Sequence, residues 1–218
     1  MSEEPRAFQR IGSVTFPRPR GIDINMMPLV LGDRSTWTDE CVVYEDILAS
    51  CAFPQDEVCY LSIHEAELRV GETLRRPGIH TEATPFGAWG GGGLGRGPRG
   101  REPWDGKTGI YQASTDGRCR IWDVMTDAVS LGGSVVRKPD GDGVVMEPGM
   151  LFWMTDRTPH ESLPVEVAGW RQWFRLVSPN IAIWWAQHST PNPTGLAVPA
   201  SVRVMPGDKF AVDPAHFR

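Results

Sequence analysis

The sequence has no excess of basic residues and no long apolar run. Its 218 residues include 22 Lys and Arg against 27 Asp and Glu, a formal net charge of −5, so the usual electrostatic basis for binding nucleic acids or anionic membranes is missing. The longest uncharged stretch, residues 176–202, is interrupted by several prolines and is too polar to span a bilayer. We therefore expect no nucleic-acid partner and no membrane partner.

Cysteine is sparse and shows no metal-binding or redox spacing. The four cysteines, Cys41, Cys51, Cys59 and Cys119, form no Cys-x-x-Cys pair. The acidic start MSEEP also lacks the basic and apolar regions of a secretory signal. These absences favour free thiols and a cytoplasmic location.

Glycine and proline are plentiful and fall between short apolar runs. The 24 glycines and 19 prolines separate segments that are rich in β-branched and aromatic residues, a pattern typical of many short strands. The predicted strands cover residues 58–63, 109–113, 119–125, 129–136, 144–146, 150–154, 170–177, 181–186 and 202–204. One helix is predicted after a Thr36 cap, with Cys41, Tyr44 and Leu48 on its apolar face.

These elements predict a single, mainly β domain over residues 1–218. The succession of strands favours a double-stranded β-helix, or jelly roll, with one or a few flanking helices. An N-terminal extension of about residues 1–56 would precede a barrel of about residues 57–205.

A glycine-rich segment, residues 89–107, interrupts the predicted strands. Gly90, Gly92 and Gly95 match G-x-G-x-x-G, but no strand precedes them and no helix follows, so the segment is predicted to be a loop and not a nucleotide site. Basic residues outnumber acidic ones in it, a balance that fits either attraction of an anionic substrate or a solvated loop. Its position after a candidate ligand strand predicts a substrate gate at the mouth of the barrel.

The candidate chemistry lies in a His-x-Glu triplet that follows a Pro-Gly turn. On a strand, alternation places His80 and Glu82 on the same face, where they can bind one metal ion together. A second histidine, His160, ends an apolar strand that begins after another Pro-Gly turn. Arg171 opens the next strand, and Arg175 has the same parity.

The order His-x-Glu, distal His and then Arg resembles the iron(II)- and 2-oxoglutarate-dependent dioxygenases over roughly residues 58–187. The resemblance implies that His80, Glu82 and His160 bind catalytic Fe(II), leaving open positions for a 2-oxo acid and dioxygen. It also implies that Arg171 binds the far carboxylate of 2-oxoglutarate through its planar fork. Arg175 is the alternative for that role, because spacing alone does not separate the two.

The resemblance further implies oxidation of a small organic molecule, with succinate and CO₂ as coproducts. Glu82 stands where halogenases of this superfamily carry a small residue, so hydroxylation, desaturation or a related oxidation is favoured. His64 lies in a strand that could also line the pocket. The oligomeric state stays open.

Two other function classes remain as alternatives. One is a cupin-type metalloenzyme that does not use 2-oxoglutarate, such as a ring-cleaving dioxygenase or an isomerase. The other is a non-catalytic jelly-roll binding module, in which His80 and Glu82 only bond to neighbouring strands. A zinc hydrolase is disfavoured because the chain has no His-Glu-x-x-His helix.

Overall fold

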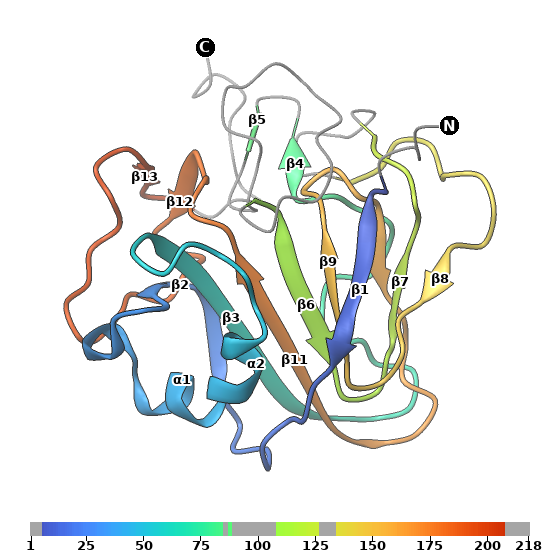
Figure 1. Cartoon of the computed structure of the whole chain (residues 1–218). Helices are drawn as coiled ribbons and strands as arrows, with labels where there is room; N and C mark the ends of the chain where they lie inside the picture. Colours follow the sequence, from blue (N-terminus) through green and yellow to red (C-terminus); the bar gives the residue numbers. More distant parts are fainter. Residues whose placement is uncertain (1–5, 85–86, 89–107, 127–133, 208–218) are drawn as a thin grey trace.

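The computed structural model describes residues 6–84, 87–88, 108–126 and 134–207. Within these ranges the chain is mainly β, with antiparallel sheets and few helices. The largest sheet has six antiparallel strands in the order β1-β9-β6-β11-β3-β2 (Figure 1). In that order the strands are β1 Phe8–Ser13, β9 Met150–Met154, β6 Ile110–Ser114, β11 Gly169–Val177, β3 Val58–Leu68 and β2 Asp23–Val30.

Smaller sheets complete the β structure. A three-stranded antiparallel sheet has the order β10-β7-β8. Its strands are β10 His160–Ser162, β7 Cys119–Ile121 and β8 Val144–Val145. The remaining pairs are the antiparallel β4 Ala83–Thr84 with β5 Gly87–Ala88, and the parallel β12 Ile183–Trp185 with β13 Arg203–Met205.

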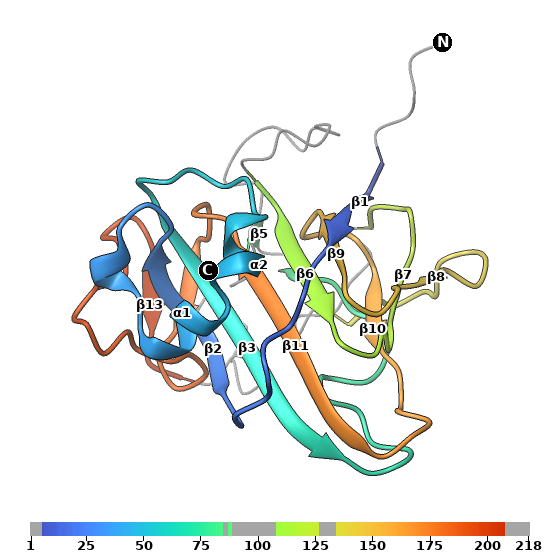
Figure 2. The ribbon, with the colours of Figure 1, turned by 60° about the horizontal axis from the view of Figure 1, so that its bottom comes forward.

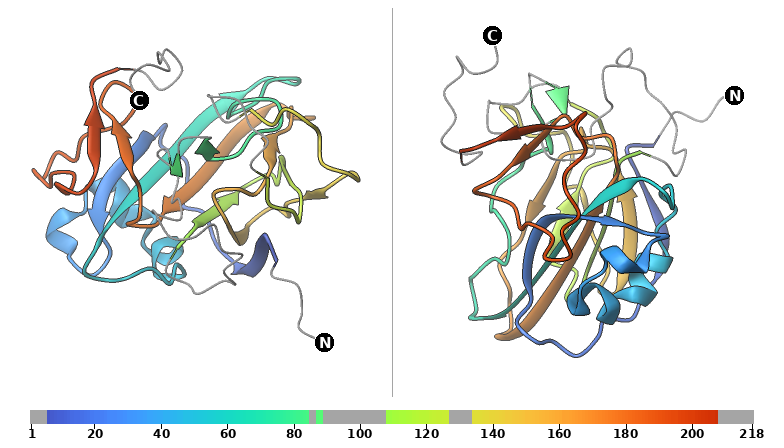
Figure 3. Two further views of the ribbon diagram at one scale, coloured as in Figure 1. Left: turned by 90° about the horizontal axis from the view of Figure 1, so that it is seen from above. Right: turned by 90° about the vertical axis from the view of Figure 1, so that its left-hand side faces the viewer.

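Strand β11 occupies an inner position and buries side chains on both of its faces. It pairs with β3 on one side and β6 on the other, and in the view from above β2, β3 and β11 run side by side (Figure 3). Phe174 and Leu176 join the core cluster that includes the helices. Arg171, Trp173 and Arg175 have the opposite parity and therefore lie on the other face.

The face that carries Phe174 and Leu176 is covered by two short helices, α1 Asp39–Val43 and α2 Glu45–Ala49. Both helices lie against the sheet near β2 and β3 (Figure 2). The other face packs against residues of the three-stranded β10-β7-β8 sheet, so the main sheet separates the two largest clusters of the core. A third, small cluster joins β12 and β13.

The predicted single helix is wrong in its start and its continuity. A 3₁₀ turn, η1 Arg34–Thr36, precedes α1, and the cap is Thr38, whose Oγ1 accepts a hydrogen bond from the Cys41 N–H. The backbone leaves helical geometry at Tyr44, between α1 and α2. The predicted apolar face is nevertheless buried: Cys41, Tyr44 and Leu48 all lie in the core.

Most predicted strands are present, but the list was incomplete. Segment 58–63 extends to Leu68, and 119–125 shrinks to three residues. Strands β1, β2, β4, β5 and β10 were not predicted. Since β1 and β2 are the edges of the main sheet, the sheet begins well before residue 57. Most of the predicted strand 129–136 and the predicted gate 89–107 lie outside the described residues.

No helix in the described ranges has the length and apolarity needed to cross a membrane. All four cysteines are buried as free thiols, as the sequence predicted.

A buried carboxylate, Glu65 on β3, ties the helices to the sheet. Its Oε2 accepts the backbone N–H groups of Arg20 at 2.6 Å and Ile22 at 3.0 Å. Its Oε1 accepts the Tyr44 hydroxyl at 2.7 Å and the Gln172 amide at 2.9 Å. Burial raises the pKa of Glu65, but these four donors outweigh burial and hold the pKa below its usual value.

Changing Glu65→Gln should lower the free energy of unfolding by about 2 to 3 kcal/mol at pH 7, because an amide NH₂ would face groups that donate. Glu67→Gln is the matched control, since Glu67 lies two residues later on β3 and is exposed. The control should change stability by less than about 0.5 kcal/mol. Urea unfolding measures both.

The same carboxylate predicts acid sensitivity. The folded pKa of Glu65 is lowered, so ionised Glu65 contributes stability above its unfolded pKa of about 4.3, and the contribution is lost as pH falls through the folded pKa. Between pH 7 and pH 3, Glu65→Gln should therefore lose less stability than the unmodified protein. Equal losses would contradict the role assigned to Glu65.

Candidate metal centre

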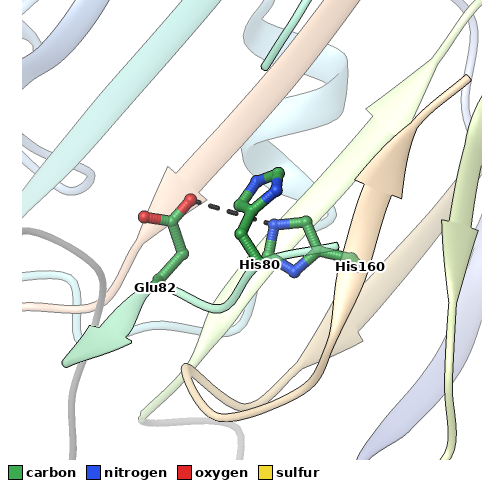
Figure 4. A group of neighbouring side chains, drawn as sticks. All are labelled: His80, Glu82 and His160. Atoms are coloured by element: carbon green, nitrogen blue, oxygen red, sulfur yellow. Dashed lines mark ion pairs between the residues drawn. The ribbon is translucent and has the colours of Figure 1, made fainter. Parts of the chain in front are cut away.

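Three side chains predicted to bind a metal converge in the structure. One ligand atom from each of His80, Glu82 and His160 lies within 4.8 Å of the other two. Figure 4 shows the three side chains turned toward one another, with His160 Nε2 at 3.9 Å from Glu82 Oε1. The imidazole ring centres of His80 and His160 are 4.5 Å apart.

Backbone pairing brings the two histidines together. The His80 N–H donates to the His160 carbonyl, and the His160 N–H donates to the His80 carbonyl, both at 2.9 Å. The Glu82 N–H donates to the Asp156 carbonyl at 2.9 Å, so Glu82 is also held to the segment that precedes β10. Directly opposed residues of an antiparallel pair point to the same face, so this pairing places both imidazoles on one side.

Each histidine is held in the tautomer that a metal requires. His80 Nδ1 lies 2.8 Å from the Gly78 carbonyl, and His160 Nδ1 lies 3.0 Å from the Thr158 carbonyl. A carbonyl oxygen only accepts, so Nδ1 carries the proton in both rings and the Nε2 lone pairs are available. Gly78 has a φ of +79°, which a glycine adopts without strain, and this turn places its carbonyl beneath His80.

Burial keeps both imidazoles neutral. It lowers the pKa of His80 to about 3, with a further contribution from neighbouring His160. Burial also lowers the pKa of His160, although the Glu82 carboxylate opposes that shift. Neutral imidazole is the form that binds a metal, so neither ring has to lose a proton near pH 7.

The two candidate arginines have different surroundings. Arg175 Nη1 donates to Glu82 Oε1, and Arg175 Nη2 lies 3.3 Å from Ser62 Oγ. Arg175 therefore orients a candidate metal ligand.

Arg171 is held at a different point. Its Nε lies 2.8 Å from Asp116 Oδ1 and 3.3 Å from Ser114 Oγ. The side chain is 2% exposed, and neither Nη1 nor Nη2 has a hydrogen-bond partner among the described residues. The Nη1 and Nη2 groups of Arg171 are therefore available to donate hydrogen bonds to an anion.

No protein-family model, curated protein or solved structure gives a significant match to the chain. The chemistry of the centre is therefore inferred from the side chains that form it.

Other polar groups on the same side of the main sheet also lack partners. Tyr60 Oη, Gln112 Oε1 and Ser162 Oγ are buried without a hydrogen bond among the described residues. Gln112 pairs directly with Arg175 across β6 and β11, and Ser162 shares a face with His160 on β10. Buried polar groups are normally satisfied, so these atoms retain hydrogen-bonding capacity for a polar ligand or water.

The donor set fits a divalent transition metal. Two imidazole nitrogens and one carboxylate on one side match the ligand set of non-heme Fe(II) centres that keep open coordination positions. Imidazole and carboxylate are also ligands of Mn(II) and Zn(II).

Sequence reasoning missed two residues near this centre, one that contacts Arg171 and one that contacts Trp173. Asp116, which pairs with Arg171, belongs to a β6–β7 turn that closes at Gly117, where an added Cβ would lie 2.2 Å from the Met146 carbonyl. Arg75 stands five residues before His80, beside the motif itself, but no local pattern indicates that its side chain turns inward.

Changing His80, Glu82 or His160 to alanine should weaken binding of Fe(II) or Mn(II) by about a hundredfold or more, since even the loss of a group behind a ligand costs about 10- to 100-fold. Anaerobic isothermal titration calorimetry measures the affinity. His188→Ala, a histidine outside the cluster, serves as the control and should bind metal normally. Full metal affinity in His80→Ala would show that the assignment is wrong.

Proposed function

We propose that the protein is a non-heme Fe(II)- and 2-oxoglutarate-dependent oxygenase that oxidises a small organic molecule. The observation that carries this proposal is the buried Arg171 fork, on the same side of the sheet as the His80, Glu82 and His160 cluster, with two Nη groups that have no partner among the described residues. A metal site alone fits many enzymes. A metal site accompanied by an anion-binding arginine fits a metal-chelating 2-oxo acid with a second carboxylate.

The strand order supports the double-stranded β-helix that the resemblance implies. Strands β3, β11, β6 and β9 are consecutive neighbours in the main sheet, while His80 pairs with β10 at the edge of the β10-β7-β8 sheet. From residue 58 to residue 177 the chain passes repeatedly between the main sheet and the β10-β7-β8 sheet, a path that is compatible with a jelly roll. The proposed site lies between these sheets.

Each residue has a distinct part in this proposal. His80, Glu82 and His160 would hold iron(II), which supplies the activation of dioxygen when it is bound. Arg175 keeps the Glu82 carboxylate in place through its Nη1 hydrogen bond. Arg171, held by Asp116, binds the far carboxylate of 2-oxoglutarate.

The overall reaction balances without a further reductant. 2-Oxoglutarate loses CO₂ and becomes succinate, and this oxidation supplies two electrons. One oxygen atom of O₂ enters succinate, and in a hydroxylation the other enters the product. The retained carboxylate of Glu82 favours hydroxylation, desaturation or a related oxidation over halogenation.

Changing Arg171→Met should weaken 2-oxoglutarate binding by on the order of 3 kcal/mol, about a hundredfold or more, because a buried bidentate ion pair is lost. Metal affinity should be unchanged. Arg175→Met should show the reverse, with weaker metal binding because Glu82 loses its donor. Anaerobic titration of the Fe(II)-loaded protein with 2-oxoglutarate, followed by its visible charge-transfer band, measures the first effect.

The same titration separates the alternatives. If Arg175→Met loses 2-oxoglutarate and Arg171→Met does not, the two roles are exchanged. Metal binding without 2-oxoglutarate binding would favour a cupin-type metalloenzyme. Absence of metal binding would favour a binding module.

A further inference from the structure

Arg75 lies in the connection between β3 and β4, and its side chain turns back over the face of the main sheet that carries Trp173 and Arg175. Its guanidinium carbon lies 4.5 Å from the centre of the Trp173 ring, and its Nη1 lies 2.7 Å from His64 Nε2. Trp173 and His64 are directly opposed on β11 and β3. Arg75 therefore covers the cross-strand pair of Trp173 and His64, and Trp173 lies two residues before Arg175 on the same face of β11.

The contact with His64 holds Arg75 without neutralising it. A guanidinium only donates, so His64 Nε2 accepts from Arg75 and the ring proton is on Nδ1. That Nδ1–H donates to Asp23 Oδ1 at 2.6 Å. His64 is thus neutral in this arrangement, and Asp23, the carboxylate that its Nδ1 contacts, has an exposed side chain.

Within the part of the chain that the structure describes, Arg75 has no close counter-ion. Among the described residues, no carboxylate forms an ion pair with it; Glu82, whose charge acts on Arg75, is paired with Arg175. Burial, together with the positive charge of Arg175, lowers the pKa of Arg75 to about 10. The Arg75 guanidinium is a second positive charge near Arg175 and has no ion pair among the described residues. A bound anion would therefore stabilise it.

We infer that Arg75 forms a second anion subsite beside the metal centre, and that this subsite binds an acidic oxyanion of the primary substrate, a carboxylate or a phosphate. Calling this anion part of the primary substrate rests on the proposed function, in which the Arg171 fork binds 2-oxoglutarate. The subsite itself depends only on Arg75, His64 and Trp173.

The contacts of Arg75 define how the anion binds. Trp173 covers a face of the guanidinium, and Nη1 is engaged with His64. The remaining N–H groups lie in the plane of the guanidinium, where they form a fork for two oxygens of one acid group. A neutral amide of the same shape is rejected because it presents only one such oxygen and no charge.

The test uses metal-free full-length protein carrying Arg171→Met, in which both the Arg171 fork and the metal are absent as anion sites. Acetate and inorganic phosphate are the probes, and acetamide is the neutral match for acetate. Binding is followed by the ¹H–¹⁵N signal of the Arg75 Nε–H, assigned by its loss in Arg75→Lys. Acetate or phosphate should shift this signal saturably, and acetamide should bind at least tenfold more weakly than acetate.

Adding Arg75→Met should weaken the tighter probe at least tenfold, measured by calorimetric competition. The matched control is Arg69→Met, an exposed arginine on the same connection, which should bind the probe normally. Thermal unfolding provides the second readout. Unchanged probe affinity in Arg75→Met, with a lowered melting temperature, would overturn the inference and make Arg75 a structural residue.

A separate titration distinguishes this inference from the proposed function. In Mn(II)-loaded protein, Arg75→Met alone should bind 2-oxoglutarate within about threefold of the unmodified protein. A loss as large as that of Arg171→Met would place Arg75 in the cosubstrate site and overturn the inference. Failure of the unmodified protein to bind Mn(II) or 2-oxoglutarate would instead overturn the proposed function, while the acetate and phosphate titrations would still decide whether the subsite exists.

Discussion

The register of β11 is the constraint on which the rest of the structure depends. Phe174 and Leu176 pack beneath the helices. Arg171, Trp173 and Arg175 lie on the opposite face, the one that packs against the three-stranded β10-β7-β8 sheet. Since side chains alternate with a period of two, a slip of one residue would move the arginines into the apolar core. The register is held by pairing on both sides of β11. Trp173 lies opposite His64 on β3 and opposite Ser114 on β6.

This register places charge in the interior, which costs stability unless each charge has a partner. Arg175 is compensated by Glu82, and Arg171 by Asp116, but the Arg171 Nη groups and the whole of Arg75 are left without a carboxylate among the described residues. A core built only for stability would use apolar residues at these places. The arrangement is understandable if metal and anionic ligands complete it, because a bound ligand stabilises the folded state that binds it.

Much of the β architecture could be predicted, because turn residues and two-residue alternation are local properties. Strand β9 was predicted with its bounds, and β11 to within one residue. Strand β2 was missed because Pro28 and a bulge between Ile24 and Met27 obscure its alternation, although an edge strand tolerates both. The helix was placed too early because Thr36 and Thr38 are both good caps, and the hydroxyl of Thr36 bonds instead to the Val30 and Asp33 carbonyls.

The sequence by itself determined the mainly β class, the shared face of His80 and Glu82, and the shared parity of Arg171 and Arg175, because each depends on residues a few positions apart. Only the tertiary structure decided that His160 pairs with His80, that Arg175 contacts Glu82 while Arg171 contacts Asp116, and that Arg75 turns inward onto Trp173. These contacts join segments far apart in the chain. Their geometry follows from the pairing of whole strands, which no short stretch of sequence encodes.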